Sequence, residues 1–170
     1  MKNLALAGLT ATLFVAAAPP GFAENEAPCG TLQGLRARLA ETRTKSAAER
    51  SAVADAFASC AAREGTPLVI PAAGPGRVRF LFPFRSDAAR VFLAGDINGW
   101  STSSHSLEKL PDSDLHVLEL EVPDGARLDY KFVAEGTEWM LDPWNPRTMP
   151  GGFGPNSELR TPSYTPPADV

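Results

Sequence analysis

The spacing of apolar residues changes once along this chain of 170 residues. Between Thr31 and Arg63, apolar side chains recur at intervals that are typical of amphipathic helices. Beyond Gly76, they alternate with polar side chains over short runs, which is typical of strands in a half-buried sheet. The pattern therefore predicts a helical unit followed by a β unit.

The helical unit is predicted to be a hairpin of two helices. Its apolar residues at helical spacing are Leu32, Leu35, Leu39, Val53, Phe57 and Cys60. The run SAAE at 46–49 has the form of a capping box, in which the side chains of Ser46 and Glu49 each accept the other residue's backbone N–H. The second helix is expected to begin there, with the turn near Thr44 and Lys45.

The two cysteines of the chain, Cys29 and Cys60, lie at equal distances from this turn. In an antiparallel hairpin they meet at its open end, and we expect a disulfide between them. A metal site would need more ligands than these cysteines and the two distant histidines, His105 and His116, offer. We expect the hairpin to span residues 24–64 and to act as a structural clamp or as a partner-docking element.

Residues 1–23 have the pattern of a secretory signal peptide. A basic residue, Lys2, precedes a short apolar run, and a Pro-Pro-Gly break and the small residue Ala23 follow it. The run is short for a transmembrane helix, and no basic anchor follows it. We expect a periplasmic or secreted protein without membrane insertion. Loss of Lys2 makes the formal net charge of −4 more negative, which argues against nucleic acid as a partner.

The β unit is expected to span residues 77–164, between a Pro/Gly-rich linker at 65–76 and a tail at 165–170. The predicted strands are Arg77 to Phe84, Arg90 to Asp96, Leu115 to Val122, Arg127 to Ala134, Glu138 to Asp142 and Asn156 to Thr161. Short strands between turn-forming residues, with no helical pattern among them, predict an antiparallel β-sandwich. The fold class is therefore mainly β, preceded by the helical hairpin.

Two of these strands suggest a surface for a sugar. Alternation along Arg127 to Ala134 places Lys131 on the solvent side of the sheet. Trp139 follows a Glu-Gly turn, in a strand expected to pair with this one. If both lie on one face, a flat ring adjoins a long hydrogen-bond donor, and Trp100 in VFLAGDINGWS could complete a platform for the C–H face of a pyranose. The alternative is burial of these tryptophans in the core.

Catalytic motifs are absent from the sequence. It contains no nucleophile elbow, no His-Glu-X-X-His and no phosphate-binding glycine loop. Its acidic residues are expected at solvent-exposed positions in turns and strands, and no motif indicates a pair of catalytic carboxylates of the glycosidase kind. His105 is expected in a loop and His116 on the outward face of a strand. The protein is therefore not expected to be an enzyme.

Four runs resemble carbohydrate-binding module family 48, the glycogen-binding modules of AMP-activated protein kinase beta subunits and of branching and debranching enzymes. They are VFLAGDINGWS, LELEVPDGARLDYKFV, EGTEWMLDPWNP and GPNSELR. The resemblance covers about Gly76 to Tyr164 and implies an early-set immunoglobulin-like sandwich. It says nothing about the preceding helices.

The resemblance also implies a binding site for an α-glucan of the glycogen or maltooligosaccharide kind. Trp100 and Trp139 match the two tryptophans that stack on glucose, while Lys131 and Asn156 match the residues that hydrogen-bond its hydroxyls. Phe153 is the nearest candidate for the apolar loop residue that reaches around the sugar chain. The Asp-Pro of LDPWNP matches a structural turn of the family. No metal or organic cofactor is implied.

A second hypothesis comes from the segment that follows residue 141. It resembles the modules that precede enterochelin-esterase-like hydrolases, many of which pack on the enzyme and bind no glucan. The sequence ends at Val170, about where such a hydrolase would begin. We therefore expect a free-standing exported module, or a family member without its enzyme. The alternative function is an accessory domain that docks on a partner hydrolase or associates with itself.

Overall fold

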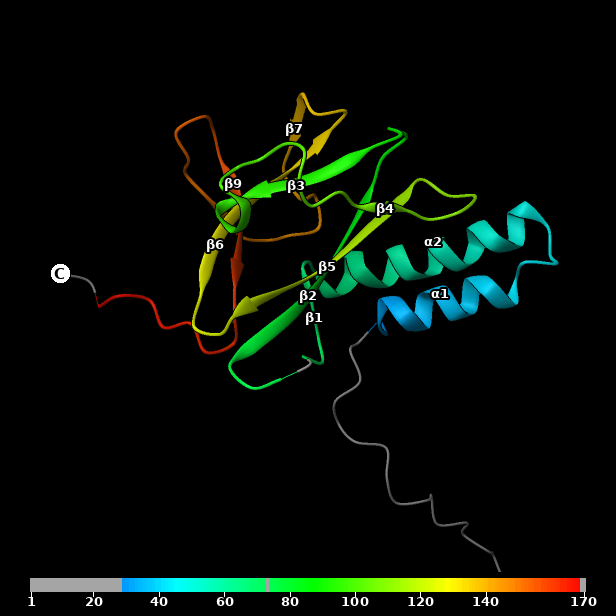
Figure 1. The fold of residues 1–170 in the computed structure, drawn as a ribbon, viewed down its shortest axis with the longest axis horizontal. Helices are drawn as coiled ribbons and strands as arrows, with labels where there is room; N and C mark the ends of the chain where they lie inside the picture. Colours follow the sequence, from blue (N-terminus) through cyan, green and yellow to red (C-terminus); the bar gives the residue numbers. More distant parts are fainter. Residues whose placement is uncertain (1–28, 73, 169–170) are drawn as a thin grey trace, which may run out of the picture.

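A computed structural model describes residues 29–72 and 74–168 of the chain. A helical hairpin lies along one side of two stacked antiparallel sheets (Figure 1). The helices are α1 (Leu32–Glu41) and α2 (Ala47–Glu64). The predicted fold class, a mainly β immunoglobulin-like sandwich preceded by a disulfide-closed hairpin, is confirmed. The expected signal peptide lies outside the described residues.

The first sheet, called sheet A, has the strand order β1-β2-β5-β4. Its strands are β1 (Leu68–Ile70), β2 (Arg77–Arg85), β4 (Glu108–Lys109) and β5 (Leu115–Pro123). Sheet B has the order β3-β6-β9-β8, with β7 paired to the end of β6. Its strands are β3 (Val91–Gly95), β6 (Arg127–Ala134), β7 (Glu138–Met140), β8 (Thr148–Met149) and β9 (Asn156–Arg160). A short 3-10 helix, η1 (Asp96–Asn98), follows β3.

The hairpin has the capping and the crosslink that the sequence predicts. The Thr31 side chain caps α1, and Ser46 and Glu49 form the capping box at the start of α2. Cys29 and Cys60 are joined by a disulfide, with their Cα atoms 5.7 Å apart. The two helices are thus fixed to each other at the open end of the hairpin.

Two apolar clusters hold the layers together. One lies between the helices and the outer face of sheet A, where Leu35 and Phe57 pack with Leu81 and Val117. The other lies between the sheets and contains the aromatic residues Phe80, Phe82, Phe84, Tyr130 and Phe132. Because the helices cover sheet A, the outer face of the sandwich that no described helix covers belongs to sheet B.

Two expectations from the sequence need correction. The segment 65–76 is more than a linker, since it contains β1, whose Leu68 and Ile70 are buried against the helices. His116 does not point outward but is completely buried. Its neighbours Leu115 and Val117 already face the helices, so both faces of β5 are covered there, and His116 points between the sheets.

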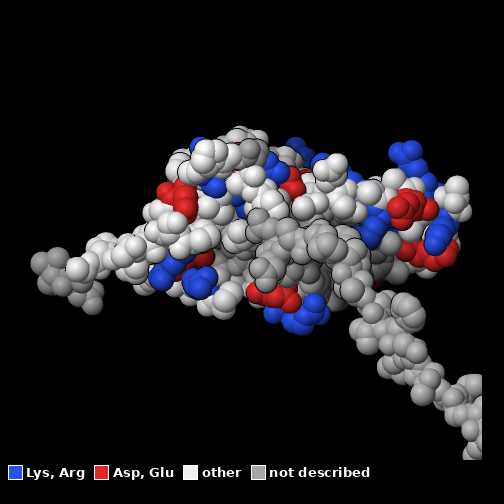
Figure 2. Space-filling view, turned by 90° about the horizontal axis from the view of Figure 1, so that it is seen from below, with Lys and Arg blue, Asp and Glu red and all other residues white. Residues whose placement is uncertain are grey.

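The surface carries charges of both signs. On the face in Figure 2, the described basic and acidic residues are interspersed rather than gathered into a patch of one sign. Neither described helix has the length and apolarity needed to cross a bilayer.

Candidate functional site

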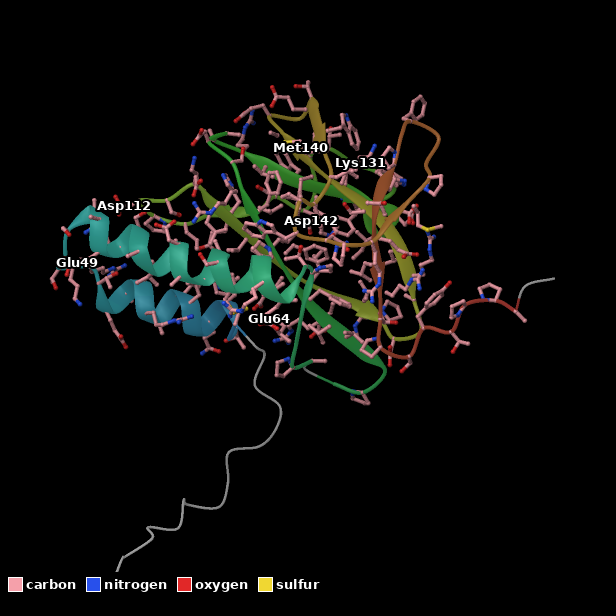
Figure 3. All side chains as sticks on the ribbon, turned by 180° about the vertical axis from the view of Figure 1, so that it is seen from behind. Glu49, Glu64, Asp112, Lys131, Met140 and Asp142 are labelled. Carbon is pink, nitrogen blue, oxygen red and sulfur yellow. A yellow bond between two sulfur atoms is a disulfide. The ribbon has the colours of Figure 1, made fainter. Side chains whose placement is uncertain are left out.

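A cavity of about 810 Å³ opens on sheet B, a size within the usual range for ligand sites. Its lining consists of Trp100, Lys131, Trp139, Gly152, Phe153 and Asn156. All five predicted sugar-binding residues therefore line one pocket. Figure 3 shows Lys131 on the part of the sandwich remote from the helices. The hairpin neither covers nor extends this pocket, because it packs on the other sheet.

The pairing of β6 with β7 brings Lys131 and Trp139 to one face. Trp139 lies opposite Val133, and side chains two residues apart on a strand share a face. Trp139 is 45% exposed, which is unusual for so large an apolar side chain. The Glu135-Gly136 turn joins the two strands, and both residues adopt positive φ.

Trp100 reaches the same pocket from the end of η1. The chain turns at Gly99, with φ of 62°, and at Trp100 itself, with φ of 63°. The Trp100 N–H donates to the carbonyl of Gly95 at 2.9 Å, which closes the turn. The ring is half-buried, and its centroid lies 6.3 Å from that of Trp139, with 34° between the two planes. The two rings therefore form a bent aromatic wall.

Asn156 and the β8–β9 loop form the opposite side of the pocket. Asn156 is only 8% exposed, and its Nδ2 donates to Oδ2 of Asp129 at 3.3 Å. Phe153, in the Gly-rich loop before β9, is 99% exposed. Its backbone carbonyl accepts a hydrogen bond of 3.2 Å from Nζ of Lys131, so the lysine connects the sheet to the loop.

The lining combines flat apolar surfaces with a few hydrogen-bonding groups. No carboxylate is among the described residues that line the pocket, and Lys131 provides its single cation. The described part of the chain contains no cluster of histidine, cysteine and acidic side chains able to hold a metal ion. This chemistry suits a neutral ligand with an apolar face and polar edges.

Two residues next to the site were not predicted from the sequence. The carboxylate of Asp96 accepts the indole N–H of Trp100 at 3.1 Å, and that of Asp129 holds Asn156. Asp96 directly follows β3 and is the last residue of the predicted strand Arg90 to Asp96, while alternation places Asp129 on the face of Lys131. This alternation is the one feature of the sequence that indicates a place for Asp129 next to the site.

Comparison with known proteins finds a family similarity for most of the sandwich. Residues 70–145 match the family model for carbohydrate-binding module 48, the isoamylase N-terminal domain. No curated protein matches the sequence. The family match includes Trp100, Lys131 and Trp139 and ends before Phe153 and Asn156.

Among solved structures, the enterobactin esterase of Shigella flexneri, determined in the presence of enterobactin, matches with 16% identity and a TM-score of 0.48 over 56% of this chain and 33% of that one. The ferric enterobactin esterase of Salmonella typhimurium matches with 14% identity and a TM-score of 0.49, over 57% and 34% of the two chains. The chain thus spans about a third of the length of these structures. By the family match, residues 70–145 of this chain are similar to carbohydrate-binding module family 48.

Proposed function

We propose that this protein is a non-catalytic, exported carbohydrate-binding protein that binds α-glucan chains in the pocket on sheet B. The match of residues 70–145 to a carbohydrate-binding family supports the general function. In this proposal, Trp100 and Trp139 stack on neighbouring glucose units, Lys131 and Asn156 hydrogen-bond their hydroxyls, and Phe153 covers the chain from the loop.

The bend between the two indoles is the observation that carries the proposal. Successive glucose units of an α-1,4-glucan turn in one direction, so the apolar faces of neighbouring units are inclined to each other. An extended β-1,4-glucan is a flat ribbon and suits coplanar rings. The 34° between Trp100 and Trp139 matches the curved chain.

The polar groups supplement this aromatic wall. Lys131 carries three N–H donors, of which the bond to the Phe153 carbonyl uses one. The Nδ2 of Asn156 is directed toward Asp129, and this fixes the orientation of the amide and leaves its oxygen as an acceptor. The site therefore offers both donors and an acceptor to hydroxyl groups.

A titration with sugars of defined linkage tests the proposal. Maltoheptaose and β-cyclodextrin at millimolar concentration are expected to quench tryptophan fluorescence, whereas cellohexaose is not. Trp144 packs against the hairpin cluster, away from the pocket, so Trp144→Phe should keep this quenching. Absence of any response to both α-glucans would refute the proposal.

A matched pair of variants locates the binding. Trp139 and Val69 are exposed to nearly the same extent, 45% and 46%, but Val69 lies on β1 of sheet A. Trp139→Ala is expected to abolish binding with little change in melting temperature, while Val69→Ala should bind normally. A large loss of stability in Trp139→Ala would instead assign this ring to the core.

The signal-like segment at residues 1–23 supports export. Expression of the full chain in a Gram-negative host, followed by mass spectrometry of the soluble periplasmic protein, is expected to give a mature N-terminus at Glu24. Recovery of the protein with residues 1–23 intact would contradict this part of the proposal.

The alternative, an accessory domain that docks on a hydrolase, gains no support from the hairpin. Its buried apolar side chains pack against sheet A. The exposed large hydrophobic residues of the described chain are Val69, Trp139 and Phe153, none of which lies on the helices.

A further inference from the structure

We propose that Asp96 and Asp129 form a brace that positions Trp100 and Asn156 for sugar binding. This inference rests on the proposed function, because it assigns positioning residues to the same pocket. Neither aspartate lines the cavity. Each acts through a residue that does.

Asp96 uses both of its carboxylate oxygens. Its Oδ1 accepts the indole N–H of Trp100 at 3.1 Å, and its Oδ2 accepts the backbone N–H of Asp129 on β6 at 2.8 Å. The indole is thereby attached, through one side chain, to the central strand of sheet B. Both bonds go to an ionised acceptor, which makes them stronger than bonds between neutral groups.

Trp100 needs such an attachment because, among the described residues, only Asp96 forms a hydrogen bond with its ring. It lies at the exit of a turn with a left-handed backbone, and its side chain is only half-buried. The indole N–H is its one polar atom, so the bond to Asp96 selects the side-chain rotamer and the tilt toward Trp139. The same bond leaves Trp100 only its ring face to offer to a ligand.

Asp129 extends the brace across the pocket. Its backbone N–H is held by Asp96, and its Oδ2 accepts Nδ2 of Asn156. Its Oδ1 lies 2.8 Å from Nη2 of Arg127, and this ion pair helps to hold the largely buried carboxylate in place. One connected set of hydrogen bonds therefore reaches from the first tryptophan to the asparagine on β9.

An aspartate at position 96 suits this role for a specific reason. The two groups that face its carboxylate, the indole and the amide of Asp129, are both donors. In Asp96→Asn, one acceptor oxygen is replaced by an NH₂ group that points at a donor. This nearly isosteric change therefore removes one arm of the brace without creating a cavity.

Circular dichroism can detect the ring orientation without any ligand. Two indoles with centroids 6.3 Å apart couple their electronic transitions, and the resulting pair of bands depends on the angle between the rings. Trp139→Phe removes the coupling and identifies the signal. Asp96→Asn is expected to change it markedly. Asp124→Asn is the matched control, since Asp124 also accepts backbone and side-chain N–H or O–H groups, from Gly125 and Ser163.

Affinity for β-cyclodextrin gives the second measurement. Asp96→Asn is expected to bind about tenfold more weakly, which corresponds to the loss of one charge-assisted hydrogen bond. In the Trp100→Phe background, which lacks the indole N–H, the same substitution should reduce the affinity by a distinctly smaller factor. A merely destabilising effect of Asp96→Asn would be equal in both backgrounds.

The results separate the two proposals. If the wild type binds and Asp96→Asn retains both the coupled bands and the affinity, the brace is refuted and the proposed function stands. If the wild type binds no glucan, the proposed function fails, and the spectrum alone decides: bands altered in Asp96→Asn support the brace, and unaltered bands overturn it.

Discussion

The hydroxyl of Tyr130 donates a hydrogen bond of 2.7 Å to Oδ2 of Asp142 inside the molecule. The same oxygen accepts the hydroxyl of Thr66, also at 2.7 Å. Tyr130 belongs to the core between the sheets, whereas Thr66 directly follows the helical hairpin. In Figure 3, Asp142 lies between these two parts of the molecule. Its carboxylate therefore joins the hairpin to the sandwich.

Replacement of Asp142 by alanine is expected to destabilise the protein. Burial raises the pKa of Tyr130, so its hydroxyl remains a donor at any physiological pH. Without the carboxylate, two buried hydroxyl donors lose their acceptor, at a cost of about 1–3 kcal/mol each. Urea unfolding should show this loss of stability. Tyr130→Phe removes one donor instead of the acceptor, so its free energy of unfolding should fall by less. An unchanged urea midpoint in Asp142→Ala would contradict the proposed joint.

The same carboxylate makes a pH-dependent contribution to the free energy of unfolding, and its sign is unusual for an aspartate. Burial raises the pKa of Asp142, although hydrogen bonds from Tyr130 and Thr66 partly oppose the rise. The folded protein then holds this proton more tightly than the unfolded chain. The contribution is complete below the ordinary pKa of 3.8 and is lost as the pH rises through the raised value. The unfolding free energy of Asp142→Asn minus that of the wild type should therefore increase from about pH 3 to pH 6. A constant difference would refute the raised pKa.

Loss of the disulfide should affect stability and leave sugar binding intact. Cys29 and Cys60 are 31 positions apart, and closing a loop of that length is worth about 3 to 4 kcal/mol in the chain-entropy model. A Cys29→Ala, Cys60→Ala double variant should unfold at lower urea concentration, and reductant should not destabilise it further. Its affinity for β-cyclodextrin should equal that of the wild type, because the helices pack on sheet A. Weaker binding would instead link the hairpin to the pocket.

The site was predictable from sequence to the extent that strand parity determines it. Alternation along β6 and the short turn before β7 bring Lys131 and Trp139 to one face, and both features are local. Family resemblance supplied Trp100 and Asn156, whose positions depend on a turn and on a strand distant in sequence. Asp96 was not recognised, because an aspartate two residues before Asn-Gly is typical of any turn.

The errors in the fold have a common physical origin. β1 is a strand of three residues, too short to be recognised by alternation, and its Leu68 and Ile70 pack against the helices. The orientation of His116 was predicted wrongly because helices cover sheet A, and a strand buried on both faces loses its alternation of apolar and polar residues. Such tertiary packing leaves little trace in a local pattern.

Gly95 should not tolerate a side chain. A Cβ at this position would lie 2.4 Å from the carbonyl oxygen of Asp129, although its backbone is extended, with φ of 177°. Gly95→Ala must therefore push β3 away from β6, at a cost of about 1–3 kcal/mol, and should also weaken sugar binding. Gly74→Ala, whose added carbon has no atom of the described residues beyond its chain neighbours within 4 Å, is the matched control. Equal melting temperatures for the two variants would contradict the close approach of the strands.

His116 is expected to make the protein less stable in mild acid. Its Nε2 lies 3.2 Å from the carbonyl oxygen of Ser86, while Nδ1 is buried and has no hydrogen-bond partner among the described residues. Burial lowers the pKa of His116, and the charge of Lys109 acts in the same direction, against the hydrogen bond to Ser86 and the charge of Asp114. Protonation would place a charge in the core, so the folded protein resists it more than the unfolded chain does.

The sign of this effect follows from linkage. Stability is complete above the ordinary histidine pKa of 6.5 and falls as the pH drops toward the lowered value, by up to about 1.4 kcal/mol per pH unit. Urea unfolding between about pH 5 and 7 should show this slope in the wild type and a flatter one in His116→Gln. His105, the second histidine of the chain, lies in a loop and provides the control variant His105→Asn, which should keep the slope. A slope that persists in His116→Gln would contradict the assignment of this pH dependence to His116.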